Sequence, residues 1–327
     1  MTPKTSHLCA YLLAAGVAAG ATVPAFAADK LKVAISQRGF WNSSIAYFAI
    51  AQGFTKRENL DVSYIFTSGG AETLQTVTTK ATDIAISTGF LGVIGAYTKG
   101  APLRVWAQEG YGTPELFHYV RADSPIKSRK DYPGRSIAFS RPGSTTHLFG
   151  IKLTEGLNPP AKLVSTGGVP ATRTQVMTGQ VDVGWSVPPF NLDIVRKGEA
   201  RIVLRGSDLP ELNKQSIRVH VVHADLLKNR RDVVRRFAKA FDDALNWMYD
   251  KPEESAKAFA EFAKISLQDA KESIPFFPRP GLELAPIIGI DQTMKEAIAN
   301  KFIKEPLTQA QLGELIQIVY DPRKDRK

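Results

Sequence analysis

The fold is decided by a pattern that occurs twice in the chain. Residues 67–87 read TSGGAETLQTVTTKATDIAIS, and residues 165–186 read STGGVPATRTQVMTGQVDVGWS. In each stretch a small hydroxyl residue precedes a Gly-Gly pair, a helix-like segment runs to an Asp, and a short apolar run ends in Ser. The second Gly precedes the Asp by 13 positions in the first stretch and by 14 in the second. This pattern predicts one βαβ element that the chain builds twice.

Short apolar or β-branched runs alternate with helix-like segments around both stretches. Strands are expected first at 31–35, 62–66, 83–86 and 103–107, with helices at 44–52, 71–80 and 90–99. The alternation then restarts, with strands at 136–139, 163–165, 181–184 and 201–204 and helices at 144–155, 170–178 and 189–197. Strand–helix alternation is typical of a mostly parallel sheet covered on both faces. The sequence therefore predicts an α/β fold with two similar lobes.

Two further extended runs, 116–120 and 217–222, are expected to be the crossovers between the lobes. The chain would then enter the second lobe once and leave it once, so that the first lobe is discontinuous. The last third is mostly helical, and its apolar spacing predicts helices that pack back on the first lobe. The expected division is a signal peptide at 1–27, lobe 1 at 28–112 and 217–327, and lobe 2 at 113–216.

The first 27 residues have the features of a secretory signal. Lys4 precedes an apolar run at 8–19, and an A-x-A pattern occupies 25–27. We expect cleavage before Ala28 and export of a soluble protein to the periplasm. Cys9, the only cysteine, lies inside this segment, so the mature chain would offer no disulfide, cysteine nucleophile or cysteine metal ligand.

Composition and motifs narrow the class of function. The formal net charge of +10 is compatible with nucleic-acid binding, but the Lys and Arg residues are dispersed and export argues against it. The sequence contains no G-x-S-x-G, no Walker A motif and no strand-linked G-x-G-x-x-G. His220 and His223 lie three apart in a strand-like run and point to opposite faces, which disfavours a metal site. We therefore expect no enzymatic activity, no cofactor, no metal and no nucleic-acid partner.

Loops rich in Ser, Thr and Gly follow the expected strands of both lobes. In open α/β sheets the ligand lies beyond the carboxyl ends of the strands, where helix N-termini offer unpaired N–H groups and a positive dipole. Several such termini directed at one cleft form an anion site. Helix capping and turn formation explain any single loop equally well.

Two arginines and four aromatic residues lie in these loops. Arg38 and Arg141 occupy equivalent loops of the two lobes. Each arginine has two interpretations: it binds a carboxylate or sulfonate of the ligand, or it is an ordinary surface residue. The aromatic side chains either stack on a ligand or pack in the core. They are Phe40, Trp41, Trp185 and Phe190.

Four segments in order carry a family resemblance. They are LKVAI at 31–35, the stretch 49–87 with its GF…ENLDV, SPIKSRKDYPGRSIAFSRPGS at 124–144, and TRTQVMTGQVDVGWSVPP at 172–189. This order resembles the nitrate/sulfonate/taurine-type substrate-binding proteins of ABC transporters, the NMT1/THI5-like family, over nearly the whole mature chain. The resemblance implies a type II periplasmic-binding-protein fold, with two α/β lobes, two crossovers and a ligand cleft between them.

The resemblance also implies where the ligand contacts fall. In the first lobe they would be Trp41, Asn42, Ser68, Gly69, Gly70, Ser87 and Thr88. In the second lobe they would be Gly143, Ser144, Thr145, Trp185 and Pro188. Pyrimidine-precursor synthases of the same superfamily carry a cysteine-rich motif that the mature chain lacks, which argues against that activity.

These observations predict a monomeric periplasmic receptor. It would capture a small organic anion, a sulfonate or a carboxylate, close on it, and deliver it to an ABC permease with its ATPase. Two alternatives remain open from the sequence, namely a secreted pyrimidine-precursor binding protein or enzyme, and a ligand-sensing periplasmic receptor.

Overall fold

The first lobe is built on a five-stranded sheet in the order β2-β1-β3-β10-β4. The computed structural model describes residues 27–326, so nearly all of the predicted signal segment lies outside the described residues. β1 pairs in parallel with β2 and β3, whereas β10 is antiparallel to both β3 and β4. The strands are β1 (Asp29–Ser36), β2 (Leu60–Thr67), β3 (Ile84–Gly89), β4 (Leu103–Tyr111) and β10 (Ser216–His223).

The second lobe repeats this order with smaller strands. β5 lies between β8 and β9 and is antiparallel to both, while β6 and β7 are parallel. A bridge between Ile137 and Val183 joins β6 to the residue before β8. The resulting order is β7-β6-β8-β5-β9, in which β5 takes the place of β10. The strands are β5 (Phe117–Arg121), β6 (Ser136–Phe139), β7 (Lys162–Ser165), β8 (Gly184–Ser186) and β9 (Ala200–Arg205).

The repeated sequence pattern has the same structural role in both lobes. Asp83 accepts a hydrogen bond from the backbone N–H of Lys32, in β1, at 2.7 Å. Asp182 accepts the corresponding bond from the Ser136 N–H at 2.8 Å, at the start of β6. A threonine near each Gly-Gly bonds a threonine six positions later. Thr67, two positions before Gly69, bonds Thr73, and Thr166, directly before Gly167, bonds Thr172. These polar residues tie each strand–helix–strand unit together.

The two runs predicted to be crossovers are instead strands of the sheets. Residues 116–120 fall largely in β5 and residues 217–222 in β10, and each strand is the antiparallel member inside its own sheet. Every residue of β10 is buried, which suits an interior strand rather than a connection between lobes. The chain passes between the sheets at 112–116 and again at 206–215.

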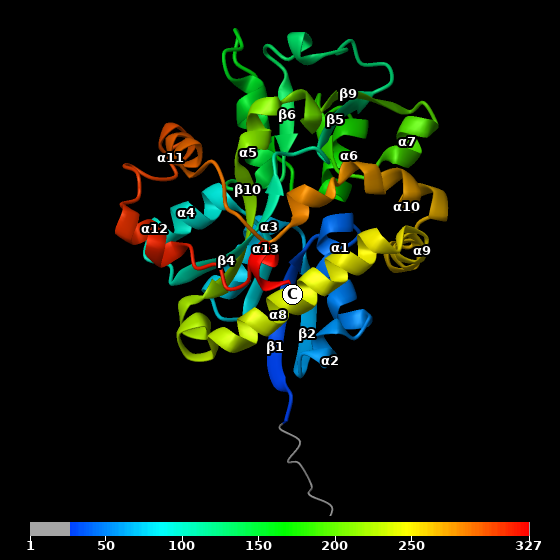
Figure 1. Cartoon of the computed structure of the whole chain (residues 1–327). Helices are drawn as coiled ribbons and strands as arrows, with labels where there is room; N and C mark the ends of the chain where they lie inside the picture. Colours follow the sequence, from blue (N-terminus) through cyan, green and yellow to red (C-terminus); the bar gives the residue numbers. More distant parts are fainter. Residues whose placement is uncertain (1–26, 327) are drawn as a thin grey trace, which may run out of the picture.

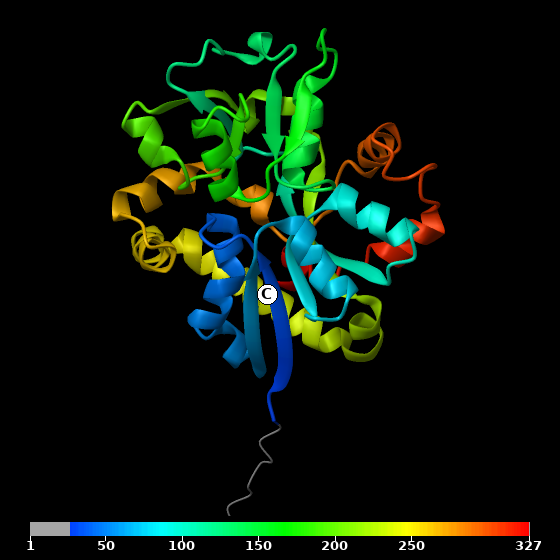
Figure 2. The ribbon, with the colours of Figure 1, turned by 180° about the vertical axis from the view of Figure 1, so that it is seen from behind.

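Helices cover both faces of each sheet (Figures 1 and 2). In the first lobe they are α1 (Trp41–Ala51), α2 (Phe54–Arg57), α3 (Gly70–Thr78) and α4 (Phe90–Thr98). In the second they are α5 (Thr145–Thr154), α6 (Val169–Met177) and α7 (Leu192–Arg196). Short 3₁₀ turns lie at Arg129–Asp131, Gly206–Asp208, Pro210–Lys214, Ile274–Phe276 and Arg279–Leu282.

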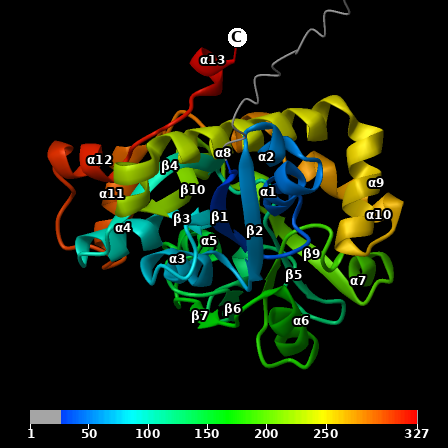
Figure 3. The ribbon, with the colours of Figure 1, turned by 90° about the horizontal axis from the view of Figure 1, so that it is seen from below.

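The C-terminal third packs on the first lobe, as the apolar spacing predicted. The long helix α8 crosses the first lobe beside α1 and α2 (Figure 3), and it buries Val233, Phe237 and Phe241. Figure 1 places α11 beside α4 and α10 near the second lobe. The C-terminal helices are α8 (Ala224–Asp250), α9 (Pro252–Ala263), α10 (Leu267–Ser273), α11 (Ile290–Ala299), α12 (Gln309–Leu315) and α13 (Pro322–Asp325). Across residues 27–326, none of these helices is long and apolar enough to cross a membrane.

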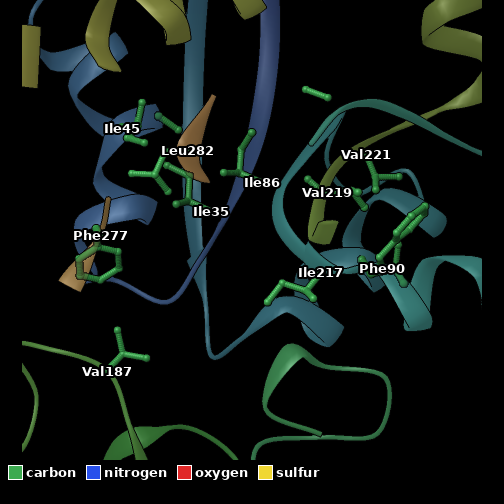
Figure 4. Close-up of a cluster of buried hydrophobic side chains, with 14 of the residues drawn as sticks. Ile35, Ile45, Ile86, Phe90, Val187, Ile217, Val219, Val221, Phe277 and Leu282 are labelled. Carbon is green, nitrogen blue, oxygen red and sulfur yellow. The ribbon is translucent and has the colours of Figure 1, made fainter. Parts of the chain in front are cut away.

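Buried hydrophobic side chains fill the space between sheet and helices in both lobes. Figure 4 shows Ile35 of β1, Ile86 of β3 and Ile45 of α1 in one cluster of buried side chains. All three side chains have no solvent exposure. This packing holds the carboxyl ends of β1 and β3, from which the candidate site is built.

Candidate functional site

A pocket lies between the two lobes at the carboxyl ends of their strands. Its cavity volume is about 60 Å³. Seven of the residues predicted to contact ligand line it, namely Asn42, Gly69, Gly70, Ser87, Ser144, Thr145 and Trp185. Further lining residues are Ser36, Gln37, Phe40, Ser43, Gly89, Glu115, Leu116, Ser140, Thr146, Val187 and Arg218.

Helix N-termini from both lobes begin at this pocket. Gly70 opens α3 and Thr145 opens α5, and both line the pocket. Ser144 is the N-cap of α5, and its hydroxyl accepts a hydrogen bond from the His147 N–H at 3.2 Å. The first turn of α5 contains no acidic residue, so nothing in that turn offsets its positive dipole. This terminus is therefore suited to an anionic group.

Three hydroxyl groups stabilise the loop before α5. The Ser140 Oγ lies 2.9 Å from the Ser144 Oγ and 2.8 Å from the Thr146 Oγ1, and the last two lie 2.9 Å apart. All three residues are buried and line the pocket. The hydroxyls thus hold one another in place on the wall that the second lobe contributes.

A buried polar network forms the first-lobe side of the pocket. The Asn42 amide donates to the Glu109 carboxylate and, at 3.2 Å, to the Ser87 hydroxyl. The Ser87 hydroxyl donates to the same carboxylate oxygen at 2.9 Å. Its backbone N–H donates to the His220 Nδ1 at 3.1 Å, and Ser87 has a left-handed φ of 68°. This unusual backbone conformation is held by bonds at both the N–H and the side chain.

Glu109 also belongs to a buried charged cluster with Arg218 and Glu115. The Arg218 guanidinium donates to Glu115, and its Nε lies 3.7 Å from the Glu109 carboxylate. Glu109 is fully buried, Glu115 is 2% exposed and Arg218 is 8% exposed. Burial lowers the pKa of Arg218, but Glu115 and Glu109 raise it above its ordinary value, so the guanidinium stays charged.

His220 lies beside this cluster and is neutral at pH 7. Its burial lowers its pKa to about 4, and the nearby Glu109 offsets this only in part. The ring accepts the Ser87 N–H through Nδ1, so Nε2 carries the proton of the neutral ring. The imidazole therefore adds no positive charge to the cluster.

Comparison with known proteins identifies the family. A family model described as NMT1/THI5 like matches residues 41–255. The chain belongs to this family. The family resemblance predicted from the sequence is thereby confirmed. No curated protein matches the chain.

Solved structures that resemble this NMT1/THI5-like protein include binding proteins and an enzyme. The alkanesulfonate-binding protein SsuA from Xanthomonas axonopodis pv. citri, bound to MOPS, has a TM-score of 0.71 and 14% identity over 88% of this chain and 98% of that one. The periplasmic aliphatic sulphonate-binding protein SsuA from Escherichia coli has a TM-score of 0.69 and 18% identity over 88% and 98%. The desulfurization enzyme DszB has a TM-score of 0.59 and 20% identity over 86% and 95%.

At these identities the structural matches establish the fold. They confirm the predicted periplasmic-binding-protein fold with two α/β lobes. The chain covers nearly the full length of each of these relatives. The two with the higher TM-scores are described as binding proteins.

The two tryptophans predicted as pocket walls have different environments in this family member. Trp41 has no solvent exposure, donates from Nε1 to the Tyr249 hydroxyl at 3.1 Å and packs edge-on against Phe259. It belongs to the core and does not line the pocket. Trp185 does line the pocket, and its buried Nε1 has no hydrogen-bond partner among the described residues.

Neither of the predicted arginines lines the pocket. Arg38 donates to the Phe262 carbonyl at 3.1 Å and stacks on the Phe262 ring at 4.9 Å. Arg141 forms an exposed ion pair with Glu72 at 3.1 Å, which joins the second lobe to the first. The arginine that reaches the pocket is Arg218 of β10.

Four more of the predicted contacts lie behind or beside the pocket. Ser68 bonds to Glu72, and the Thr88 hydroxyl donates to the Val219 carbonyl at 2.8 Å. Gly143 packs its backbone against Gly89 of the other lobe. The fourth, Pro188, is buried outside the pocket lining.

Sequence reasoning missed the charged cluster as part of the site. Arg218 interrupts the apolar run 217–222, and Glu109 follows the apolar run 103–107. A charged residue inside a buried strand requires a partner of opposite charge. Charged residues within or next to apolar runs were therefore the signal in the sequence that indicated a buried ion pair. The sequence analysis places the run 217–222 in a crossover, where Arg218 would contact solvent and need no partner.

Among the residues that line the pocket, no imidazole, thiol or amine lies beside a hydroxyl to activate it. Within residues 27–326, no group of three or more His, Cys, Asp or Glu side chains could hold a metal ion. The pocket presents helix N-termini, hydroxyl groups, two side-chain amides, one carboxylate, one guanidinium and apolar walls.

Proposed function

We propose that this protein is the periplasmic substrate-binding component of an ABC importer. The observation that carries the proposal is the pocket, which both lobes build from the ends of their strands. Such a site buries a ligand only when the lobes meet, so ligand binding favours the closed arrangement. A membrane permease then recognises the closed protein and receives the ligand.

The ligand in this proposal is a small organic molecule with an anionic group, a sulfonate or a carboxylate. The uncompensated N-terminus of α5 supports an anion, and the alkanesulfonate-binding relatives bind such molecules. The apolar side chains of Phe40, Leu116 and Val187 line the same pocket and suit a carbon skeleton. The similarity to DszB raises an enzymatic alternative. The lining residues include no imidazole, thiol or amine, and the one lining hydroxyl bonded to a carboxylate is that of Ser87, which donates to Glu109.

A thermal-shift screen of small acids and heterocycles, followed by calorimetry, tests the binding function. A ligand at one hundred times its dissociation constant should stabilise the folded protein by about 2.7 kcal/mol. Uptake of that ligand by cells with and without the gene then tests the transport role, because a sensor would leave uptake unchanged. N-terminal sequencing of the exported protein tests the predicted signal peptide, and the sequence obtained should begin at Ala28. A screen without any stabilising compound counts against the proposal.

A further inference from the structure

The ion pairs that cross between the lobes all have the same polarity. Among the described residues outside the connecting segments 112–116 and 206–215, three cations of the second lobe reach four carboxylates of the first. These pairs are Arg141–Glu72 at 3.1 Å, Lys152–Glu296 at 2.9 Å, Arg196–Glu272 at 2.7 Å, and Arg196–Asp269. The first lobe therefore presents an anionic face to the second, and the second presents a cationic face to the first.

The pairs are spread over both sides of the interface. The carboxylates lie on α3, α10 and α11, and the cations lie on α5, on α7 and in the loop before α5. Figures 1 and 2 show α11 beside α5 on one side of the molecule and α10 beside α7 on the other. A tilt that closes one side alone would open the other. The complete set of pairs therefore forms only when the lobes approach on both sides.

Each of the four carboxylates is held in place by its own lobe. A neutral side chain three or four positions earlier donates a hydrogen bond to it, and no Lys or Arg of the described part of the first lobe pairs with it. The donors are Ser68 to Glu72, Ser266 to Asp269 at 2.8 Å, Gln268 to Glu272 at 2.9 Å and Gln292 to Glu296 at 2.8 Å. Acceptors that are already positioned lose little side-chain freedom when a cation arrives, so less of the attraction is spent on ordering them.

Separation of the lobes would leave these carboxylates with neutral donors only. Hydrogen bonds from Ser68, together with Arg141, hold the pKa of Glu72 below its ordinary value, so this group is ionised at pH 7. On the second lobe, Lys152 keeps a partner in Glu155 at 3.1 Å, whereas Arg141 and Arg196 have no carboxylate of their own lobe among the described residues. Single exposed pairs contribute little, but two faces of opposite sign attract each other as a whole.

We propose that the two charged faces form an electrostatic latch, so that the ratio of closed to open protein falls as the ionic strength rises. The exposed pairs of Arg141 and Arg196 are the part of the latch that salt screens. The pair of Lys152 and Glu296 is largely removed from water and is screened less. This inference concerns the movement of the lobes, on which the proposed function depends, and its test needs no ligand.

Single-molecule energy transfer across the mouth of the cleft measures the ratio of closed to open protein. Gln75→Cys on α3 and Thr174→Cys on α6 provide exposed dye sites on the two lobes, and the chain from Ala28 onward contains no other cysteine. The ratio should fall by about threefold or more between about 10 mM and about 500 mM sodium chloride, because the salt screens the attraction between the faces. A ratio that does not change over this range overturns the latch.

The variant Arg196→Glu places a third carboxylate beside Asp269 and Glu272, which turns attraction into repulsion. We expect the ratio of closed to open protein at low salt to fall by about tenfold or more. Adding Glu272→Arg restores one opposite-charge pair and should return part of this loss. The matched control is Arg121→Glu, since both arginine side chains are 41% exposed but Arg121 pairs with Asp123 inside the second lobe. Equal ratios in the two single variants overturn the role of Arg196.

The salt series on the otherwise unchanged protein decides the latch even if Arg196→Glu fails to fold. The latch and the proposed function also fail separately. If the ratio of closed to open protein does not respond to salt, the latch is wrong and the binding function is untouched. If no compound of the broad screen binds, the binding function fails, whatever the lobes do in salt.

Discussion

Lys152 of α5 lies 2.9 Å from the Glu296 carboxylate of α11, and this ion pair joins the two lobes. The side chains are 11% and 4% exposed, so both charges are largely removed from water. Gln215 lies in the segment 206–215, through which the chain passes between the lobes, and its side-chain amide also donates a hydrogen bond to Glu296 at 3.0 Å. Burial lowers the pKa of Lys152, but Glu296 raises it above its ordinary value, so the amine stays protonated. The pair therefore connects the two lobes beside the segment 206–215, through which the chain passes between them.

Lys152→Met should weaken ligand binding more than it weakens folding. Glu296 would be buried without its cation only while the lobes are in contact, so the cost falls on the closed form. We expect an affinity loss of about tenfold or more, measured by calorimetry, and a larger radius of gyration by solution scattering. Lys80→Met is the control, because its pair with Asp225 lies within the first lobe and is exposed. Equal losses in both variants would contradict the interlobe role.

Gly89→Ala should block lobe closure without harming the fold. A Cβ at Gly89 would lie 2.3 Å from the Gly143 carbonyl oxygen of the other lobe, while its φ of −68° suits alanine. We expect an affinity loss of about tenfold or more, with the free energy of unfolding unchanged within about 1 kcal/mol. Gly313→Ala is the control, since a Cβ there meets nothing within 4 Å. Calorimetry and urea unfolding measure both quantities, and unchanged affinity in Gly89→Ala refutes the contact.

Trp185→Phe should reduce ligand affinity by about 1–1.5 kcal/mol, because it removes the Nε1 donor and keeps an aromatic ring. Trp106 of β4 provides the control. Its Nε1 is also buried without a partner, and it does not line the pocket. Trp106→Phe should therefore leave affinity unchanged. Calorimetry on the two variants with the best ligand of the screen decides, and equal effects would place the indole of Trp185 outside ligand contact.

Arg141→Ala should change ligand affinity by less than about threefold, because its ion pair with Glu72 is exposed and such pairs contribute little. Arg38→Ala should likewise preserve affinity, since this side chain covers Phe262 on the outside of the first lobe. Calorimetry measures both. A tenfold loss in Arg141→Ala would show that this arginine reaches the ligand.

Stability should fall on acidification through His220. Burial lowers its folded-state pKa to about 4, whereas an unfolded imidazole titrates near 6.5. Between these values the unfolded chain binds a proton that the folded chain does not, so the free energy of unfolding falls as the pH drops from about 6.5 to about 4. This group accounts for a loss on the order of 3 kcal/mol. Urea unfolding of wild type and His220→Gln from pH 7 to pH 4 should show a smaller decline in the variant.

Local patterns in the sequence were sufficient for the architecture. Asp83 and Asp182 follow the same motif and accept the same hydrogen bond from a strand backbone N–H, so the repeat predicts a repeated unit. Periodicity and Gly-Gly turns depend on neighbours within about 15 residues, and these are visible in the sequence. The exceptions were β5 and β10. β10 pairs antiparallel with strands more than a hundred positions earlier, and β5 pairs antiparallel with β8 and β9, which come far later in the chain.

The tertiary structure decided which of the predicted residues line the pocket and which lie in the core. Both tryptophans are expected in loops, but Trp41 opens α1 and Trp185 lies in β8. Tyr249 of α8 and Phe259 of α9 pack against Trp41 and enclose it in the core.

The sequence by itself determined the two α/β lobes, the helix termini at the ends of the strands and the family. Only the tertiary structure decided which arginine and which tryptophan line the pocket, and that two carboxyl groups meet one guanidinium there. Burial and charge pairing depend on the positions of β4, the first crossover and β10 relative to one another. Glu109, Glu115 and Arg218 come from these segments, and no local pattern specifies their meeting.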